Sequence, residues 1–251
     1  MNEVEVYYAF RATTQTIVIT IGFFSAFIAA FVRAPKIDKD TTIFAILLSL
    51  LLWWRLGWLP IGWGFSFDRS EYALSFLGVQ NNPHLSADGQ DALFGVLLFW
   101  ISRIANVETF FIIQSAIYVL LYFWVCKRLI GNNIYWLLVG CAVSMGFISY
   151  GINTLRAGLA ISFVLLGLSY SKSLWKMGIC LAIGLGIHFS MSIPIAMILI
   201  AKYFDRTRLF FILWLLSIPV SFFAGTYFNE LFAEFTDDSR NQYLINQKNT
   251  I

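Results

Sequence analysis

The residues of this sequence that could do chemistry are a few charged and polar side chains set among long apolar runs. Arg156 lies between the apolar stretches 129–155 and 157–171, which hold no other formal charge. An arginine in such a setting normally faces a polar cavity, pairs with an anion or snorkels to the membrane surface. Its guanidinium fork suits a phosphate or pyrophosphate, and the amides at the start of a helix favour the same ligand. We therefore expect Arg156 to be the centre of an anion-binding site, with a snorkelling interfacial arginine as the alternative.

Several carboxylates are candidates for proton transfer near this arginine. Asp68 and Glu71 are three residues apart, Tyr72 follows directly, and Asp91 opens an apolar segment. A carboxylate that loses water beside lipid headgroups has a raised pKa and becomes a usable base for a hydroxyl group. The alternative for each of them is an ordinary solvated loop carboxylate.

His188 lies beside Ser190 in a run without other charge and is a candidate proton carrier or hydrogen-bond donor. A hydrogen bond that packs two membrane helices is the alternative. Because burying a polar group alone is costly, we expect the polar residues at the outer ends of the apolar runs to share one wet cavity. These residues are Arg55, Asp68, Arg69, Glu71, Asp91, Arg103, Asn153, Arg156 and His188. The two histidines and the lack of a paired acidic motif predict no metal site and no cofactor.

The composition places these residues in a membrane protein. Hydrophobic residues make up 59% of the chain and charged residues 12%, whereas a soluble domain carries roughly 25% charged residues. The mean hydropathy is +0.74. Lipid must therefore be most of the solvent. The net charge of +3 is dispersed and argues against nucleic acid as a partner.

A helix needs about 20 apolar residues to cross a bilayer, and charges divide the sequence into pieces near that length. We expect an all-α polytopic bundle of about eight membrane-embedded segments in one integral membrane domain, 1–251. No signal-peptide pattern precedes the first run, so it should remain in the mature protein. Polar residues fill an expected loop at 67–91 and a tail at 229–251. The expected segments are 12–32, 41–59, 92–104, 109–126, 129–150, 157–171, 177–201 and 209–227.

Two of these segments are irregular. The run 92–104 is too short for an ordinary span, so it either re-enters the membrane or crosses as a short tilted helix. Glycines, serines and Pro194 interrupt 177–201 near His188, which predicts a broken helix or a hairpin. The basic clusters all fall on one side if 92–104 re-enters and the chain turns back at His188. That side should be the cytoplasm, with Arg156 and His188 at the opposite face.

Four short motifs in this order resemble the EpsG-type, Wzy-like polysaccharide polymerases over roughly residues 64–201. They are Asp68 to Tyr72, Asp91-Ala-Leu-Phe94, Asn153-Thr-Leu-Arg156-Ala-Gly-Leu-Ala160 and His188-Phe-Ser190. The resemblance implies a metal-independent glycosyltransferase of the bacterial inner membrane, in exopolysaccharide, capsule or O-antigen assembly. Such an enzyme moves a glycan from a polyprenyl diphosphate carrier onto a lipid-linked repeat unit at the outer face.

The resemblance also implies roles for individual residues. Arg156 would hold the diphosphate, His188 would assist it, and Asp68 or Asp91 would activate the acceptor hydroxyl. The family commonly has Glu-Pro-Leu-Phe where this chain has Asp91-Ala-Leu-Phe94, which leaves the role of Asp91 open. The expected substrate-binding residues are Arg55, Arg69, Glu71, Tyr72, Arg103, Asn153 and Ser190.

The expected partners are the polyprenyl-diphosphate-linked oligosaccharide, membrane lipid, and the chain-length regulator and flippase proteins of the same pathway. The chain is shorter than typical members, so a minimal or a truncated member is expected. The competing interpretations are a lipid-linked sugar translocator or export component, a glycan ligase that uses a different acceptor, and a structural scaffold.

Overall fold

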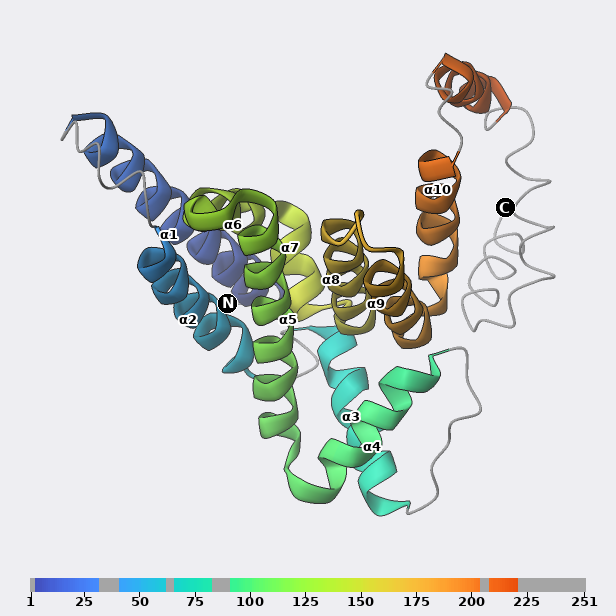
Figure 1. Cartoon of the computed structure of the whole chain (residues 1–251). Coiled ribbons are helices and arrows are strands. Elements are labelled where there is room, and N and C mark those ends of the chain that lie inside the picture. Colours follow the sequence, from blue (N-terminus) through green and yellow to red (C-terminus); the bar gives the residue numbers. More distant parts are fainter. Residues whose placement is uncertain (1–2, 32–40, 62–65, 83–90, 204–207, 221–251) are drawn as a thin grey trace. The chain divides into compact units, whose positions relative to one another are not determined.

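A computed structural model describes residues 3–31, 41–61, 66–82, 91–203 and 208–220, and every regular element within these ranges is a helix (Figure 1). The all-α prediction is therefore confirmed for the described residues. The chain divides into two compact units, Met1–Met197 and Ile198–Ile251. The expectation of one membrane domain stays a prediction, and all residues discussed below belong to the first unit unless stated.

The first unit holds nearly all of the described helices. In chain order they are α1 (Glu3–Phe31), α2 (Thr42–Gly57), α3 (Phe67–Asn81), α4 (Ala92–Ile104), α5 (Val107–Ile130), η2 (Gly131–Asn133), α6 (Ile134–Val143), α7 (Met145–Ile152), α8 (Leu155–Ser169), α9 (Leu174–Ile187), η3 (Phe189–Met191) and α10 (Ser192–Tyr203), which continues into the second unit. The second unit also contains the helix Arg208–Val220.

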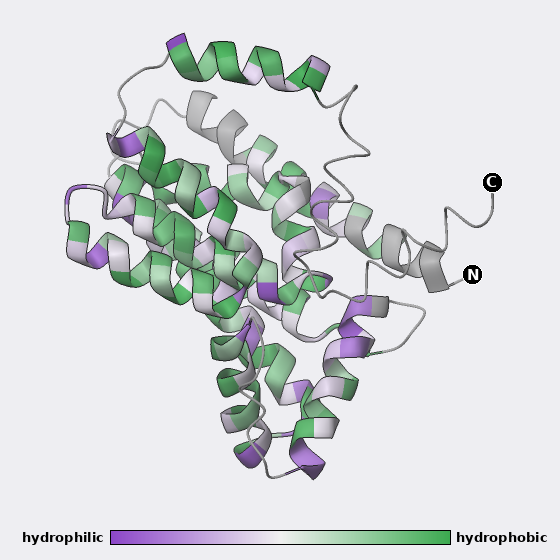
Figure 2. Ribbon diagram, turned by 90° about the vertical axis from the view of Figure 1, so that its right-hand side faces the viewer, coloured by the Kyte–Doolittle hydropathy of each residue, from purple (hydrophilic) through white to green (hydrophobic). Residues whose placement is uncertain are grey.

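Among the described residues, one helical stretch, Val107–Val143, is long and apolar enough to cross a membrane. The other apolar helices are shorter, so the expected number of about eight membrane-embedded segments is not confirmed by length alone. Their surfaces are nevertheless unlike those of soluble proteins. Figure 2 shows hydrophobic residues along the lengths of the helices. In α2, for example, Leu48 and Leu52 are buried, while Leu47 and Leu50 on the other side are 59% and 50% exposed. A helix that is apolar all round belongs in a protein core or in lipid.

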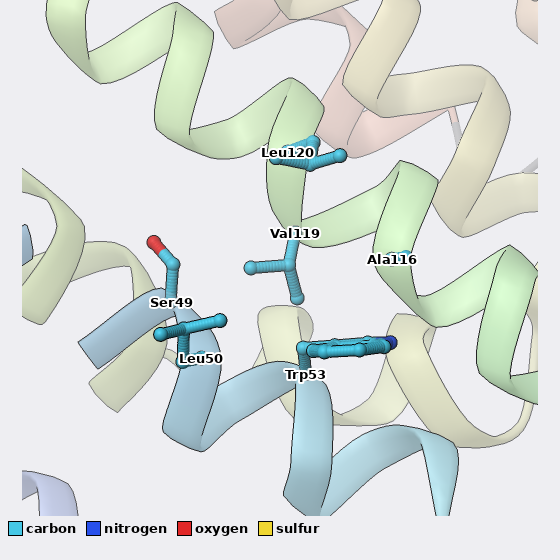
Figure 3. Close-up of a pocket in the computed structure, with 6 residues that line it drawn as sticks. All are labelled: Ser49, Leu50, Trp53, Ala116, Val119 and Leu120. Carbon is cyan, nitrogen blue, oxygen red and sulfur yellow. The ribbon is translucent and has the colours of Figure 1, made fainter. Parts of the chain in front are cut away.

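The long helix α5 connects two clusters of buried side chains. One surrounds Tyr118 and Phe147 with residues of α2, α6 and α7, and the other surrounds Phe94 and Phe110 with residues of α3, α4 and α8. Between α2 and α5 lies a cavity of about 230 Å³ (Figure 3). It is lined by Ser49, Leu50, Trp53, Ala116, Val119 and Leu120, and none of the predicted site residues reaches it.

The structure corrects two expectations about the helices. Part of the expected polar loop 67–91 is α3, because the Ser66 hydroxyl accepts a hydrogen bond from the Arg69 backbone N–H and caps the helix. The expected span 129–150 is interrupted: α5 runs to Ile130, and α6 and α7 meet at Ser144. The Ser144 hydroxyl caps α7 by accepting from the Phe147 N–H. A serine cap of this kind begins a new helix where an apolar run looks continuous.

Other expectations agree with the observed elements. The run 92–104 is helix α4 with those bounds. The break near His188 is confirmed, since α9 ends at Ile187, His188 has extended backbone angles and α10 begins at Ser192. The last expected span is helical over Arg208–Val220, while its remainder and the tail 229–251 lie outside the described residues.

Candidate active site

Arg156 is placed by the junction between α7 and α8. The junction consists of Asn153 and Thr154, and the Ser66 hydroxyl donates a hydrogen bond of 2.8 Å to Asn153 Oδ1. This bond ties the start of α8 to the start of α3. A Cβ at Gly158 would collide with the Tyr150 carbonyl oxygen, so only glycine allows α8 to lie this close to α7. Arg156, in the first turn of α8, keeps 40% of its side chain exposed.

Asp91 lies at the N-cap position of α4 and makes contacts with two other helical segments. Its Oδ2 accepts a hydrogen bond of 2.7 Å from Arg156 Nη1, which is also an ion pair. Its Oδ1 accepts one of 2.9 Å from the Phe189 backbone N–H. Both oxygens lie 3.2 Å from His188 Nδ1. The carboxylate therefore joins α4 to the start of α8 and to the break after α9.

Close helix packing brings Asp91 to His188. A Cβ at Gly186 would lie 2.6 Å from Leu93 Cδ1, so the end of α9 lies directly against the start of α4. A Cβ at Gly184 would lie 3.0 Å from the Ala160 carbonyl oxygen, so α9 also lies close to α8. Since His188 follows Gly186 by two residues and Asp91 precedes Leu93 by two, these contacts bring the two side chains together. In Figure 1 the start of α4 lies near the end of α9.

Tyr72 of α3 completes the group. Arg156 Nε donates a hydrogen bond of 3.3 Å to the Tyr72 hydroxyl, and the guanidinium carbon lies 5.6 Å from the centre of the tyrosine ring. The ring of Tyr72 packs edge to face on Phe94 of α4, with 5.7 Å between ring centres. The guanidinium is thus oriented by a phenol on one side and a carboxylate on the other.

The group is partly open and can accept a ligand. Asp91 and His188 retain 17% and 19% exposure, less than the 40% of Arg156. Arg156 Nη2 donates no hydrogen bond to any of the described residues. A guanidinium that is fixed by its neighbours and has a donor unused by any described residue is suited to bind an additional anion. An imidazole and a carboxylate beside it supply groups that can move a proton.

Two predicted substrate-binding arginines have other partners. Arg69 is 1% exposed and donates to the carbonyl oxygens of Leu56, Gly57 and Leu59 at 3.4, 3.2 and 3.3 Å. Its guanidinium carbon also lies 3.9 Å from the centre of the Phe111 ring. Arg69 thus holds the end of α2 and is not available to substrate.

Arg55 and Arg103 also lie away from Arg156. Arg55 donates a hydrogen bond of 3.0 Å to the Thr14 hydroxyl and lies 4.0 Å from the centre of the Phe10 ring. Arg103 donates to carbonyl oxygens at the end of α3, those of Val79, Gln80 and Asn82. The expected common cavity for all outer polar residues is therefore too broad.

The remaining predicted residues surround the group without joining it. Asp68 and Glu71 are in α3, and their carboxylates form no ion pair with any residue that the structure describes. Asn153 contacts Ser66 and thereby positions the start of α8. Ser190 is exposed in η3, two residues after His188. The structure brings together Arg156, His188, Asp91 and Tyr72, while their roles in catalysis stay predictions.

Sequence reasoning missed two contributors. The Phe189 backbone N–H gives no signal in the sequence, because any residue except proline carries the same group. Ser66 does give one: a serine followed by Asp68 is a typical helix start, and it would have predicted α3.

The comparisons with known proteins bear on the whole of this group. No curated protein and no solved structure matches the chain. The family model described as "EpsG family" matches residues 42–250, which include all four helices that carry the site. This match covers more than half of the sequence. The chain therefore belongs to the EpsG family, which is of the Wzy-like polysaccharide polymerase type.

Proposed function

We propose that this protein is an inner-membrane polysaccharide polymerase. It transfers a glycan from a polyprenyl diphosphate carrier onto a lipid-linked repeat unit at the outer face of the membrane. The observation that carries the proposal is Arg156, an arginine at the start of an apolar helix. Asp91 and Tyr72 hold its guanidinium, and its Nη2 bonds none of the residues that the structure describes. Membership of a polymerase-type family supports the same reaction class.

The first task of such a site is to stabilise the leaving diphosphate. When the bond between the anomeric carbon and the diphosphate oxygen breaks, negative charge collects on that oxygen. A fixed guanidinium in a poorly hydrated site neutralises this charge without reorganisation, and such preorganised groups supply a large part of many rate enhancements. Arg156 takes this role, with His188 beside it. The proposal needs no metal ion, because Arg156 supplies the positive charge and His188 can supply a hydrogen bond.

The second task is to take the proton of the attacking hydroxyl. The acceptor oxygen forms the new bond to the anomeric carbon while its proton passes to a base, a step worth about 10²- to 10⁴-fold in rate. Asp91 fits this role better than Asp68, because it lies 2.7 Å from Arg156 and therefore beside the donor phosphates. Asp68 lies in the first turn of α3 without such a contact.

The membrane arrangement is part of the proposal. We place about eight segments in the inner membrane, with the Arg156 group at the outer face. With 13 residues, α4 is about 20 Å long, shorter than a bilayer core of about 30 Å, which supports a re-entrant segment. The proposed partners are membrane lipid, a chain-length regulator and a flippase that delivers the lipid-linked repeat units.

Incubation of the purified protein with one lipid-linked repeat unit tests the reaction. We expect a ladder of products that differ by one repeat, and Arg156→Ala should abolish it while the protein still inserts. Arg128→Ala is the matched control, because Arg128 bonds the Ser169 carbonyl at the opposite end of α8 and should leave the ladder unchanged. A normal ladder with Arg156→Ala would contradict the proposal. Transfer of a finished chain to another acceptor would indicate a glycan ligase, and movement without bond formation a translocator.

A further inference from the structure

An internal carboxylate already lies where the substrate anion is expected. Asp91 is at the N-cap of α4, a position whose side chain normally accepts a hydrogen bond from its own helix. Here the side chain makes no such bond. It turns instead to Arg156 Nη1, the Phe189 N–H and His188 Nδ1. Three donors from two other segments thus converge on one carboxylate.

This arrangement matches what a phosphate group would need. Guanidinium, imidazole and backbone N–H groups bind phosphate oxygens at the same distances at which they bind carboxylate oxygens. A diphosphate bound beside an unmoved Asp91 would place like charges within a few ångströms of each other in a weakly hydrated site, which is unfavourable. The carboxylate and the phosphate therefore compete for one set of donors.

We propose that the Asp91 carboxylate occupies the seat of one substrate phosphate and is exchanged for that phosphate when the donor binds. The seat consists of Arg156 Nη1, His188 Nδ1 and the Phe189 backbone N–H. The inference rests on the proposed function and adds the Phe189 amide to the groups that hold the substrate.

The exchange gives Asp91 two states with different chemistry. Without substrate, Asp91 neutralises Arg156, which would otherwise be an unpaired charge in an apolar setting. In that state both of its oxygens are engaged by Arg156, His188 and the Phe189 N–H, so neither is free to accept the proton of a hydroxyl group. With the diphosphate bound, the carboxylate loses these contacts and lies next to the donor sugar. Donor binding thus releases the base that the acceptor hydroxyl needs.

Such competition predicts the direction of change in binding. Separating Asp91 from its donors costs free energy and so weakens the observed binding of phosphate. A variant without this carboxylate should therefore bind phosphate more tightly. Asp91→Asn should raise the affinity for inorganic pyrophosphate about tenfold while ladder formation falls. Asp68→Asn is the matched control, since it removes the same charge from α3 without touching the seat. It should leave the affinity unchanged.

The test is calorimetric titration of the purified full-length protein with inorganic pyrophosphate. Asp91→Ala provides a second variant with an empty seat, which free acetate can fill. Acetate should weaken pyrophosphate binding to Asp91→Ala and leave the wild-type protein unaffected. Arg156→Gln should lose binding altogether.

The outcomes separate this inference from the proposed function. Tighter binding by Asp91→Asn and Asp91→Ala, without a gain in Asp68→Asn, supports the exchange. Unchanged or weaker binding by both Asp91 variants overturns it, as does an equal gain in Asp68→Asn. If binding is lost in Arg156→Gln in those cases, the proposed function stands. Binding that Arg156→Gln leaves intact contradicts both.

Discussion

Arg69 and Arg156 are both charged residues in an apolar helical protein, but they differ in burial and in the groups that accept their hydrogen bonds. Arg69, at the corner of α2 and α3, is 1% exposed and donates to three backbone carbonyl oxygens. Arg156 lies where α3, α4, α8 and α9 meet; its side chain is 40% exposed and pairs with a carboxylate and a phenol. The first uses its donors within the fold, whereas the second has one amino nitrogen, Nη2, that bonds none of the described residues.

The difference teaches how to recognise a functional arginine in a membrane bundle. Carbonyl partners at the end of a helix are permanent, because the α2 backbone cannot move away from Arg69 without unfolding. A carboxylate partner can be exchanged for another anion. The chemical type of its partner and the exposed fraction of its side chain therefore distinguish a structural arginine from a functional one. The position of the arginine within an apolar run of the sequence does not.

The largest expected effect is on stability, from Arg69→Ala. Each buried carbonyl that loses its partner costs about 1–3 kcal/mol, so the free energy of unfolding should fall by about 3 kcal/mol or more. Titration with a denaturing detergent, followed by tryptophan fluorescence, measures it. Arg103→Ala is the matched control, because Arg103 also donates to three carbonyl oxygens but is exposed. Water can replace it there. An equal loss in both variants would show that burial is not what makes Arg69 structural.

The next effect, on activity, comes from Arg156→Lys. An ammonium keeps the charge but lacks the planar fork with which a guanidinium contacts the Tyr72 hydroxyl and two phosphate oxygens at once. We expect ladder formation to slow about a hundredfold, or about 2.7 kcal/mol in barrier height, while stability changes little. Single-turnover rates with a lipid-linked repeat unit provide the measurement. A lysine variant with the normal rate would show that only the charge of Arg156 matters and that the geometry of its guanidinium does not.

A smaller effect should follow from Gly186→Ala, which tests the packing that assembles the site. The new methyl group would meet Leu93, and overpacking of this kind costs about 1–3 kcal/mol. Movement of α4 away from α9 would separate Asp91 from His188. The loss in the rate of ladder formation, expressed as a free energy, should therefore exceed the loss in the free energy of unfolding. Gly178→Ala, in the same helix, is the control because nothing lies within 4 Å of its Cβ. The activity and the unfolding free energy of both variants are measured. Equal activity of Gly186→Ala and Gly178→Ala would show that the site tolerates the movement of α4 away from α9.

The sequence was informative where one residue type decides the local structure. Glycines and serines around His188 predicted the break after α9, and an apolar run between charges predicted α4 with its observed bounds. Arg156 was expected at the start of a helix and is found in the first turn of α8. These features follow from backbone chemistry within a few residues, which a single sequence contains.

The sequence was less informative where distant segments decide. Asp68, Arg69 and Glu71 together look like a loop, yet they belong to α3, and Arg69 becomes buried because the end of α2 offers it carbonyl oxygens. The approach of Asp91 to His188 depends on the close contact of Gly186 with Leu93. Such rotations and approaches of whole helices leave no local pattern in the sequence.

The smallest expected effect comes from Tyr72→Phe, which removes one neutral partner of Arg156 and keeps the ring on Phe94. The lost bond is 3.3 Å long and partly exposed, so it should be worth about 0.5–1 kcal/mol, or a two- to fivefold rise in KM. The rate at saturation should hardly change, because the bound diphosphate then orients the guanidinium. Tyr170→Phe, at the far end of α8, should leave KM unaltered. A loss as large as that of Arg156→Lys would mean that the phenol, more than the carboxylate, sets the direction of the guanidinium, and Asp91 would then be free to leave at little cost.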